Sequence, residues 1–212
     1  MDYSFLEDTE ASFRNKVEEL GLPEFVKNLP RELLGRPYHN SHHLHLVALN
    51  TLRIARSEGL SENLQKVVFA AAICHDLDYV SKDNEPANIS LAVSKFKRIS
   101  EFLNFTSEEK DFGVQSIRNT DTSVKKKFCG DSDSWILHDA DLTLWCRIRS
   151  FDHAWYLCEG IEKELGIETD VYSTLAFLKN SKIFTMTGKK LVRDLEVKLI
   201  ECPTVGRWIS YS

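Results

Sequence analysis

Apolar side chains recur every three to four residues along most of the chain, and no run of alternating polar and apolar residues is long enough to predict a strand. The spacing of Phe13, Val17 and Leu20 predicts a first helix that ends at Gly21. Glycine, proline and capping residues divide the rest of the pattern. The further predicted helices cover about 24–28, 41–57, 61–76, 88–102, 106–119, 134–144, 150–165, 171–180 and 183–200. The pattern therefore predicts an all-α protein, with residues 1–212 folded as one helical domain.

Polar segments that contain proline or glycine predict the main loops between these helices. Residues 30–38 include Pro37 and are expected to form an ordered loop before the helix that begins near Ser41. Residues 81–86 form a second predicted loop. The segment 120–134 carries a run of three lysines and predicts a mobile loop, with the lysines solvated or attracting an anionic substrate.

Composition narrows the class of protein without naming a function. The net charge of −5 provides no overall basic field, so a nucleic-acid partner is not expected. Five scattered cysteines without a CxxC pair are typical of thiols in a reducing compartment. The acidic start lacks the features of a signal peptide, and no apolar stretch has the length of a membrane span. We therefore expect a cytoplasmic protein without a membrane partner.

Histidines gather where the loop containing Pro37 meets the next helix. His39 and His43 are four residues apart, a spacing that places two side chains on one face of a helix. Pro37 complicates this reading, because His39 then lies just before the first helical turn. The pattern favours different roles, with His43 as a metal ligand and His39 as a nearby acid or base. The neighbouring His42 and His45 point away from the His43 face and are expected on the surface.

A second cluster follows an unusually apolar helix. Residues 67–74 are almost entirely apolar and lead directly into His75 and Asp76. A buried carboxylate must be neutralised, paired or bound to a cation. A divalent metal ion would resolve this cost for both side chains, since imidazole and carboxylate are common ligands of such ions.

A third cluster, His138-Asp139-Ala140-Asp141, supplies further carboxylates. Asp139 and Asp141 are two positions apart, so on a helix they point about 200° apart. Only one of them is expected to reach a shared metal ion. Their spacing alone leaves the choice open.

Taken in order, His43, His75-Asp76 and Asp141 resemble the signature of the HD-domain superfamily of metal-dependent phosphohydrolases. The segment from Tyr38 to His43 is similar to the Tyr-His-Asn-x-x-His motif of predicted bacterial HD phosphohydrolases and, more weakly, of cyclic-nucleotide phosphodiesterases. The sequences His-Asp-x-x-Tyr, ending at Tyr79, and Asp-Ala-Asp-Leu, containing Asp141, match the bacterial branch. The resemblance covers residues 36–145, and residues 146–212 are expected to add a helical elaboration.

The resemblance implies an HD-type helical bundle whose metal ligands are His43, His75, Asp76 and Asp141. It implies that the ligand is Asp141 rather than Asp139, and that His39 donates a proton to the leaving oxygen. No histidine lies between His75 and His138, which departs from dinuclear members of the superfamily. One divalent ion, of Mn, Fe, Co, Ni, Zn or Mg, is therefore expected, with at most a weakly held second ion on Asp76.

The implied reaction is hydrolysis of a phosphomonoester or phosphodiester of a nucleotide or another small phosphorylated metabolite, with Asp76 and His39 as the catalytic residues. Arg36 and Lys82 are candidates to bind the phosphate, or else solvated surface charges. Apolar residues between Trp145 and Trp155 would permit a homodimer. Two alternatives remain open: a non-catalytic nucleotide-binding module and, with less support, a di-iron oxygenase of the same fold.

Overall fold

The computed structural model describes residues 2–33, 35–81, 83–121, 132–148 and 150–201, and all regular secondary structure in this part of the chain is helical. The elements are α1 (Ser4–Glu19), the 3-10 helix η1 (Glu24–Leu33), α2 (Ser41–Ser57), α3 (Glu62–Cys74), α4 (Glu85–Phe102), α5 (Ser107–Asn119), the 3-10 helix η2 (Ser132–Trp135), α6 (Ile136–Leu142), the 3-10 helix η3 (Thr143–Arg147), α7 (Phe151–Leu165), α8 (Val171–Asn180) and α9 (Met186–Glu201). No strand occurs among the described residues. The predicted all-α bundle is confirmed.

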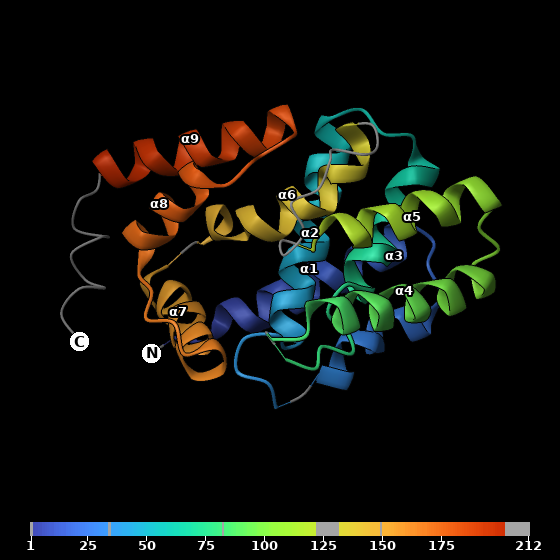
Figure 1. Ribbon diagram of the computed structural model, residues 1–212, viewed down its shortest axis with the longest axis horizontal. Coiled ribbons are helices and arrows are strands. Elements are labelled where there is room, and N and C mark those ends of the chain that lie inside the picture. The colour runs from blue at the N-terminus through green and yellow to red at the C-terminus, as the bar shows by residue number, and fades with distance from the viewer. Residues whose placement is uncertain (1, 34, 82, 122–131, 149, 202–212) are drawn as a thin grey trace.

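The helices α2 and α3 form the centre of the bundle. In α2 every residue from His42 to Leu52 is buried, and in α3 the run from Val67 to Cys74 is buried on all sides. A helix that is buried all round must be covered by neighbours on every face. The helices α1, α5 and α6 supply this cover, while α4 packs on α3 and α5. The last three helices, α7 to α9, lie together at one end of the molecule (Figure 1).

Side-chain caps place the beginnings of the helices. Asn40 caps α2 by accepting a hydrogen bond from the backbone N–H of His43, at 3.1 Å. Ser61 caps α3 in the same way, as its sequence position predicted. The capping box predicted at the start of α5 is present, with Thr106 and Glu109 exchanging hydrogen bonds.

Several predicted boundaries differ from the structure. The helix α4 begins at Glu85 rather than at residue 88, because Pro86 sits in the first turn, where its missing N–H costs nothing. The predicted loop from Pro30 is 3-10 helix as far as Leu33. The helix predicted over 134–144 is divided among η2, α6 and η3. Residues 122–131, with the lysine run, lie outside the described residues.

Across the described ranges, no helix combines the length and the apolar character needed to cross a membrane.

Candidate metal centre

Three helix ends bring the predicted ligands together. His43 lies in the first turn of α2, His75 and Asp76 follow the last turn of α3, and Asp141 lies near the end of α6. Donor atoms of His43, His75 and Asp141 all lie within 4.8 Å of one another. Segments separated by more than 30 residues thus meet at one point, and this group could hold a metal ion.

The distances between donor atoms suit a shared cation. Asp76 Oδ2 lies 3.1 Å from His43 Nε2 and 3.0 Å from His75 Nε2. Asp141 Oδ1 lies 3.6 Å and 3.8 Å from the same two nitrogens. Ligands that bind one ion at about 2.0–2.2 Å are themselves separated by roughly 3.0–3.5 Å. The four side chains are therefore arranged closely enough to become ligands with only small adjustments.

The backbone fixes which nitrogen of His75 faces the site. Its Nδ1 lies 2.7 Å from the carbonyl oxygen of Ala72, and because a carbonyl can only accept, Nδ1 carries the proton. In the neutral ring this leaves Nε2 with its lone pair. That Nε2 atom is buried and faces the Asp76 and Asp141 carboxylates, at 3.0 and 3.8 Å. A buried nitrogen with an available lone pair is what a metal ligand requires.

The charges of the cluster also favour a cation. Burial alone would raise the pKa of Asp76, but the neighbouring charges of His75 and His39 hold it well below its usual range. Burial would likewise raise the pKa of Asp141, but its contact with a protonated His75 and the charge of His43 lower it. The site therefore contains two ionised carboxylates in a largely buried position. Burial alone would lower the pKa of His75, but without a metal ion the carboxylates raise it, so that a proton on this ring offsets part of their charge. A divalent ion would take the place of that proton and leave the His43 and His75 rings neutral.

The structure separates the two aspartates that the sequence left open. Asp139 is fully buried and points away from the ligand cluster, toward the segment before α9. Its carboxylate accepts hydrogen bonds from the backbone N–H groups of Phe184 and Thr185 and from the Thr185 hydroxyl. His138 Nδ1 lies 3.1 Å from the same carboxylate. Asp139 thus anchors the C-terminal helix, and Asp141 is the carboxylate that faces His43 and His75.

His39 lies beside the cluster and before the helix, as Pro37 predicted. Its Nε2 is 3.8 Å from Asp76 Oδ2, and its ring stacks on Tyr79 with centroids 3.8 Å apart. Burial alone would lower the pKa of His39, but the charge of Asp76 and a hydrogen bond to Glu164 raise it above its usual value. A protonated imidazole next to the ligand cluster can supply a proton to a bound group.

Glu164, on α7, was not found by the sequence reasoning. Its Oε1 lies 2.8 Å from His39 Nδ1, and its Oε2 accepts the backbone N–H groups of Tyr38 and His39 at 2.7 and 3.0 Å. Burial opposes ionisation of Glu164, but these hydrogen bonds lower its pKa to about 2. The carboxylate therefore fixes both the ring and the backbone of His39. No sequence signal could have linked positions so far apart.

A glycine allows α7 to come this close. A Cβ atom at Gly160 would lie 2.7 Å from the carbonyl oxygen of Pro37, so only glycine fits there without movement. Glu164 is one helical turn further along the same face. Close packing at Gly160 thus brings the Glu164 carboxylate within reach of His39.

Asn50 is a second residue that the sequence reasoning missed. It is fully buried on α2 and donates hydrogen bonds to the carbonyl oxygen of Ala140 at 2.8 Å and to the Thr143 hydroxyl at 3.1 Å. It lies two helical turns after His43, on the same side of α2. This spacing was a readable signal, and it ties the ligand on α2 to the segment that carries Asp141.

The residues predicted to bind phosphate are less well placed. The Arg36 guanidinium lies 5.5 Å from the centroid of the Tyr79 ring and 3.5 Å from Glu164 Oε1, behind His39. Arg36 therefore contacts the groups that support His39 rather than the ligand cluster. Lys82 lies outside the described residues.

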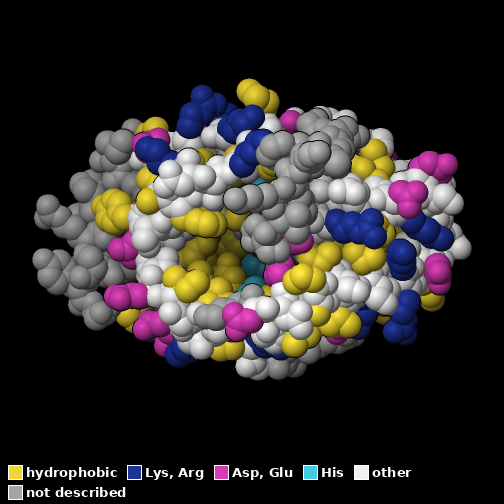
Figure 2. All heavy atoms as spheres, viewed as in Figure 1, with side chains coloured by type: hydrophobic (Ala, Val, Ile, Leu, Met, Phe, Trp, Pro, Cys, Tyr) yellow, Lys and Arg dark blue, Asp and Glu magenta, His cyan; other side chains and the backbone are white. Residues whose placement is uncertain are grey.

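A cavity of about 340 Å³ opens beside the ligands, where Tyr38, His39, His43 and Asp141 form one wall. Apolar side chains from the end of α6, from η3, from α7 and α8 and from the segment between α7 and α8 form most of the remaining lining: Leu142, Trp145, Ile161, Leu165, Ile167 and Phe177. Figure 2 shows this hollow with a hydrophobic floor and histidine at its edge. Trp145 is buried here, so it does not contribute to the exposed apolar surface expected for a dimer.

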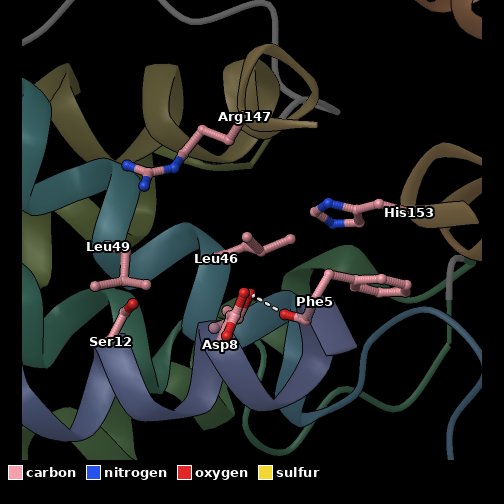
Figure 3. A pocket seen from close by; sticks show the side chains of 8 residues that line it. Phe5, Asp8, Ser12, Leu46, Leu49, Arg147 and His153 are labelled. Atoms are coloured by element: carbon pink, nitrogen blue, oxygen red, sulfur yellow. Dashed lines mark hydrogen bonds between the residues drawn. The ribbon is translucent and has the colours of Figure 1, made fainter. Parts of the chain in front are cut away.

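The prediction that His42 and His45 lie on the surface was wrong. Both are buried, because α1 and α7 cover the side of α2 opposite the ligands. His42 Nε2 lies 3.1 Å from His153 Nε2, and Phe5 stacks on the His153 ring with centroids 4.6 Å apart. The pocket next to His153 (Figure 3) measures only about 30 Å³. It has room for about one water molecule, so it is not a substrate site.

Comparisons with family models, with curated proteins and with solved structures found no match to this chain. The chemical interpretation of the site therefore depends on its own geometry.

Proposed function

We propose that this protein is a metal-dependent phosphohydrolase that cleaves a phosphate ester of a small molecule, with nucleotides among the candidate substrates. The observation that carries the proposal is the meeting of His43, His75 and the two aspartates beside a buried His39–Glu164 pair. The order of these ligands along the chain, which resembles that of the HD-domain superfamily, supports the same reading.

The proposed ligand set is His43, His75, Asp76 and Asp141. A divalent cation in this set would activate water and withdraw charge from a phosphate group. The side chains provide two negative charges and two neutral donors, a combination that suits Mn, Fe, Co, Ni, Zn or Mg. The backbone contact at His75 Nδ1 holds that ring in the tautomer needed for binding.

His39 is the proposed proton donor to the leaving oxygen. The hydrogen bond from its Nδ1 to Glu164 directs Nε2 toward Asp76 and the cavity. Glu164 is a positioning residue, because it acts on the substrate only through His39. An imidazole with a raised pKa keeps its proton to a higher pH than a free imidazole does, which suits a general acid.

The experiment compares wild type with Asp76→Ala and Asp78→Ala after removal of metal and reloading with each candidate ion. Metal content and release of phosphate or nucleoside from a panel of phosphate esters are measured. The proposal expects about one ion per chain and metal-dependent turnover, both abolished by Asp76→Ala. Asp78 is exposed and two residues away, so Asp78→Ala is the matched control and should leave both unchanged.

His39→Gln separates proton donation from metal binding. We expect it to keep the metal and to lower kcat by about 100- to 10,000-fold, the range typical of a lost general acid. Metal binding without turnover on any ester would instead favour the non-catalytic nucleotide-binding module. Absence of bound metal after reloading would contradict the proposal outright.

A further inference from the structure

The cavity beside the ligands is mostly apolar, and its outer side chains are exposed. Ile167 is 52% exposed and Phe177 is 57% exposed, although both line the cavity. Large apolar side chains left in contact with water at the mouth of a pocket mark a surface that a ligand covers. The volume of about 340 Å³ is at the lower end of the range of small-molecule sites, roughly 300–1,000 Å³.

The charges of the cavity are unevenly distributed. The ligand wall contains His39, His43 and Asp141, while the opposite side offers Glu168 and the hydroxyl-bearing residues Thr169, Ser173 and Thr174. No lysine or arginine is among the described residues that line the cavity. A chain of phosphates extending away from the metal would meet apolar side chains and one carboxylate there. An apolar group in this position would avoid both the loss of hydration and the repulsion from the carboxylate.

From these observations we propose that the substrate is a monophosphate ester of an apolar alcohol, whose ring or branched hydrocarbon group fills the space between α7 and α8. This inference rests on the proposed function for the position of the phosphate at the ligand wall. The apolar group then contacts Trp145, Ile161 and Phe177, which line this space. Substrates with a second or third phosphate are disfavoured.

Binding tests this inference without requiring turnover. The probe is 1-naphthylmethylphosphonate, which cannot be hydrolysed at its P–C bond, and the reference is methylphosphonate. Affinities for the Mn²⁺-loaded protein are measured by calorimetry. We expect the naphthyl probe to bind at least about tenfold more tightly than methylphosphonate, as burial of a ring in an apolar pocket predicts.

Variants at the mouth of the cavity locate the effect. Phe177→Ala and Ile167→Ser should each lower the affinity for the naphthyl probe by about three- to tenfold and leave the affinity for methylphosphonate unchanged. Both residues are more than half exposed, so the fold should tolerate these changes. Phe102→Ala is the matched control, because Phe102 is 64% exposed and lies on α4. Equal affinities for the two probes, or equal losses in Phe102→Ala and Phe177→Ala, would overturn the inference.

A hydrolysis assay keeps the two proposals distinct. With 1-naphthyl phosphate, glycerol 2-phosphate and ATP as substrates, we expect the lowest KM for the naphthyl ester. Turnover of all three with similar KM values would contradict the inference and leave the phosphohydrolase proposal standing. Tight binding of the naphthyl phosphonate without hydrolysis of any ester would support an apolar ligand and contradict the phosphohydrolase proposal.

Discussion

Two aspartates separated by one alanine have different structural roles. Asp141 faces two histidines across the candidate metal centre, whereas Asp139 is saturated by hydrogen bonds from the segment before α9. We expect Asp141→Asn to lower metal affinity by at least about tenfold. Asp139→Asn should retain metal binding but lose about 1–3 kcal/mol of unfolding free energy, because its donors lose a charged partner.

Metal titration and urea unfolding of both variants check this contrast. Removal of metal before unfolding keeps the two effects apart. A loss of metal affinity in Asp139→Asn that is as large as in Asp141→Asn would show that the buried aspartate also acts at the metal centre.

Glu164 provides a prediction about pH. Its pKa is lowered from 4.5 to about 2 in the folded protein. Between these two pH values the folded protein therefore binds fewer protons than the unfolded chain. The stabilisation from Glu164 is therefore complete above about pH 4.5 and is lost as the pH falls toward 2. Because Glu164 is only partly shielded from solvent, we expect the unfolding free energy of wild type to exceed that of Glu164→Gln by about 1–2 kcal/mol at pH 6, with a smaller difference at pH 3.

Urea unfolding of the two metal-free proteins between pH 3 and 6 measures this difference. Glu162→Gln serves as the control, since Glu162 is an exposed residue of the same helix. A difference between wild type and Glu164→Gln that stays constant over this range would contradict the lowered pKa.

The same residue shows where reasoning from sequence stops. His39 could be assigned a role apart from His43 because Pro37 marks the start of the helix, which is a local signal. Its partner Glu164 is 125 positions away, and one glutamate on an amphipathic helix is not distinguishable from others. The burial of His42 and His45 was missed for a related reason, because their cover comes from α1 and α7 rather than from their own helix.

At the scale of the element, the close packing of α7 against residues 37–39 depends on one glycine. Helix propensity alone predicts that Gly160→Ala stabilises α7 by about 1 kcal/mol. The contact with the Pro37 carbonyl oxygen predicts the opposite sign, because the added Cβ must push α7 away from residues 37–39. We expect a net destabilisation of about 1–3 kcal/mol and a lower kcat, with metal binding retained.

Thermal unfolding and metal content of Gly160→Ala check this expectation, with Glu162→Ala as an exposed control on α7. A rise in stability with unchanged kcat would mean that the close approach of α7 to residues 37–39 has no role in holding His39.

The positions of the helices were largely readable from the sequence. Apolar spacing and the caps at Ser61 and Thr106 predicted the bounds of α3 and α5 to within about two residues, because both signals are local. The sequence predicted helices over 24–28 and 134–144, but not that η1 continues to Leu33 or that η3 is a separate 3-10 helix. These details depend on packing against other elements rather than on local signals. The helices α7 and α8 were predicted as helices, but nothing in their sequence indicated that they form a wall of the cavity.

At the scale of the whole molecule, a metal ion would join three separate helices. His43, Asp76 and Asp141 belong to α2, the end of α3 and α6, so an ion bound to all of them stabilises the folded state only. At a free ion concentration of about 100 times Kd, the unfolding free energy should rise by about 2.7 kcal/mol. Differential scanning calorimetry with Mn²⁺ and with a chelator measures this change.

We expect the increase in Tm to vanish in Asp76→Ala and to persist in Asp78→Ala, whose side chain is exposed. An equal increase in both variants would place the bound ion at another part of the molecule.

The hydrogen bonds from two successive backbone amides to Glu164 also have a kinetic consequence. Tyr38 and His39 lie outside regular helix, yet their N–H groups are held by a carboxylate of α7. These amide hydrogens should exchange with solvent deuterium only when α7 detaches, and therefore at one common rate. In Glu164→Gln both should exchange faster together, while amides in the middle of α3 keep their rates. Hydrogen exchange at two adjacent positions would thus measure how often His39 loses its contact with Glu164.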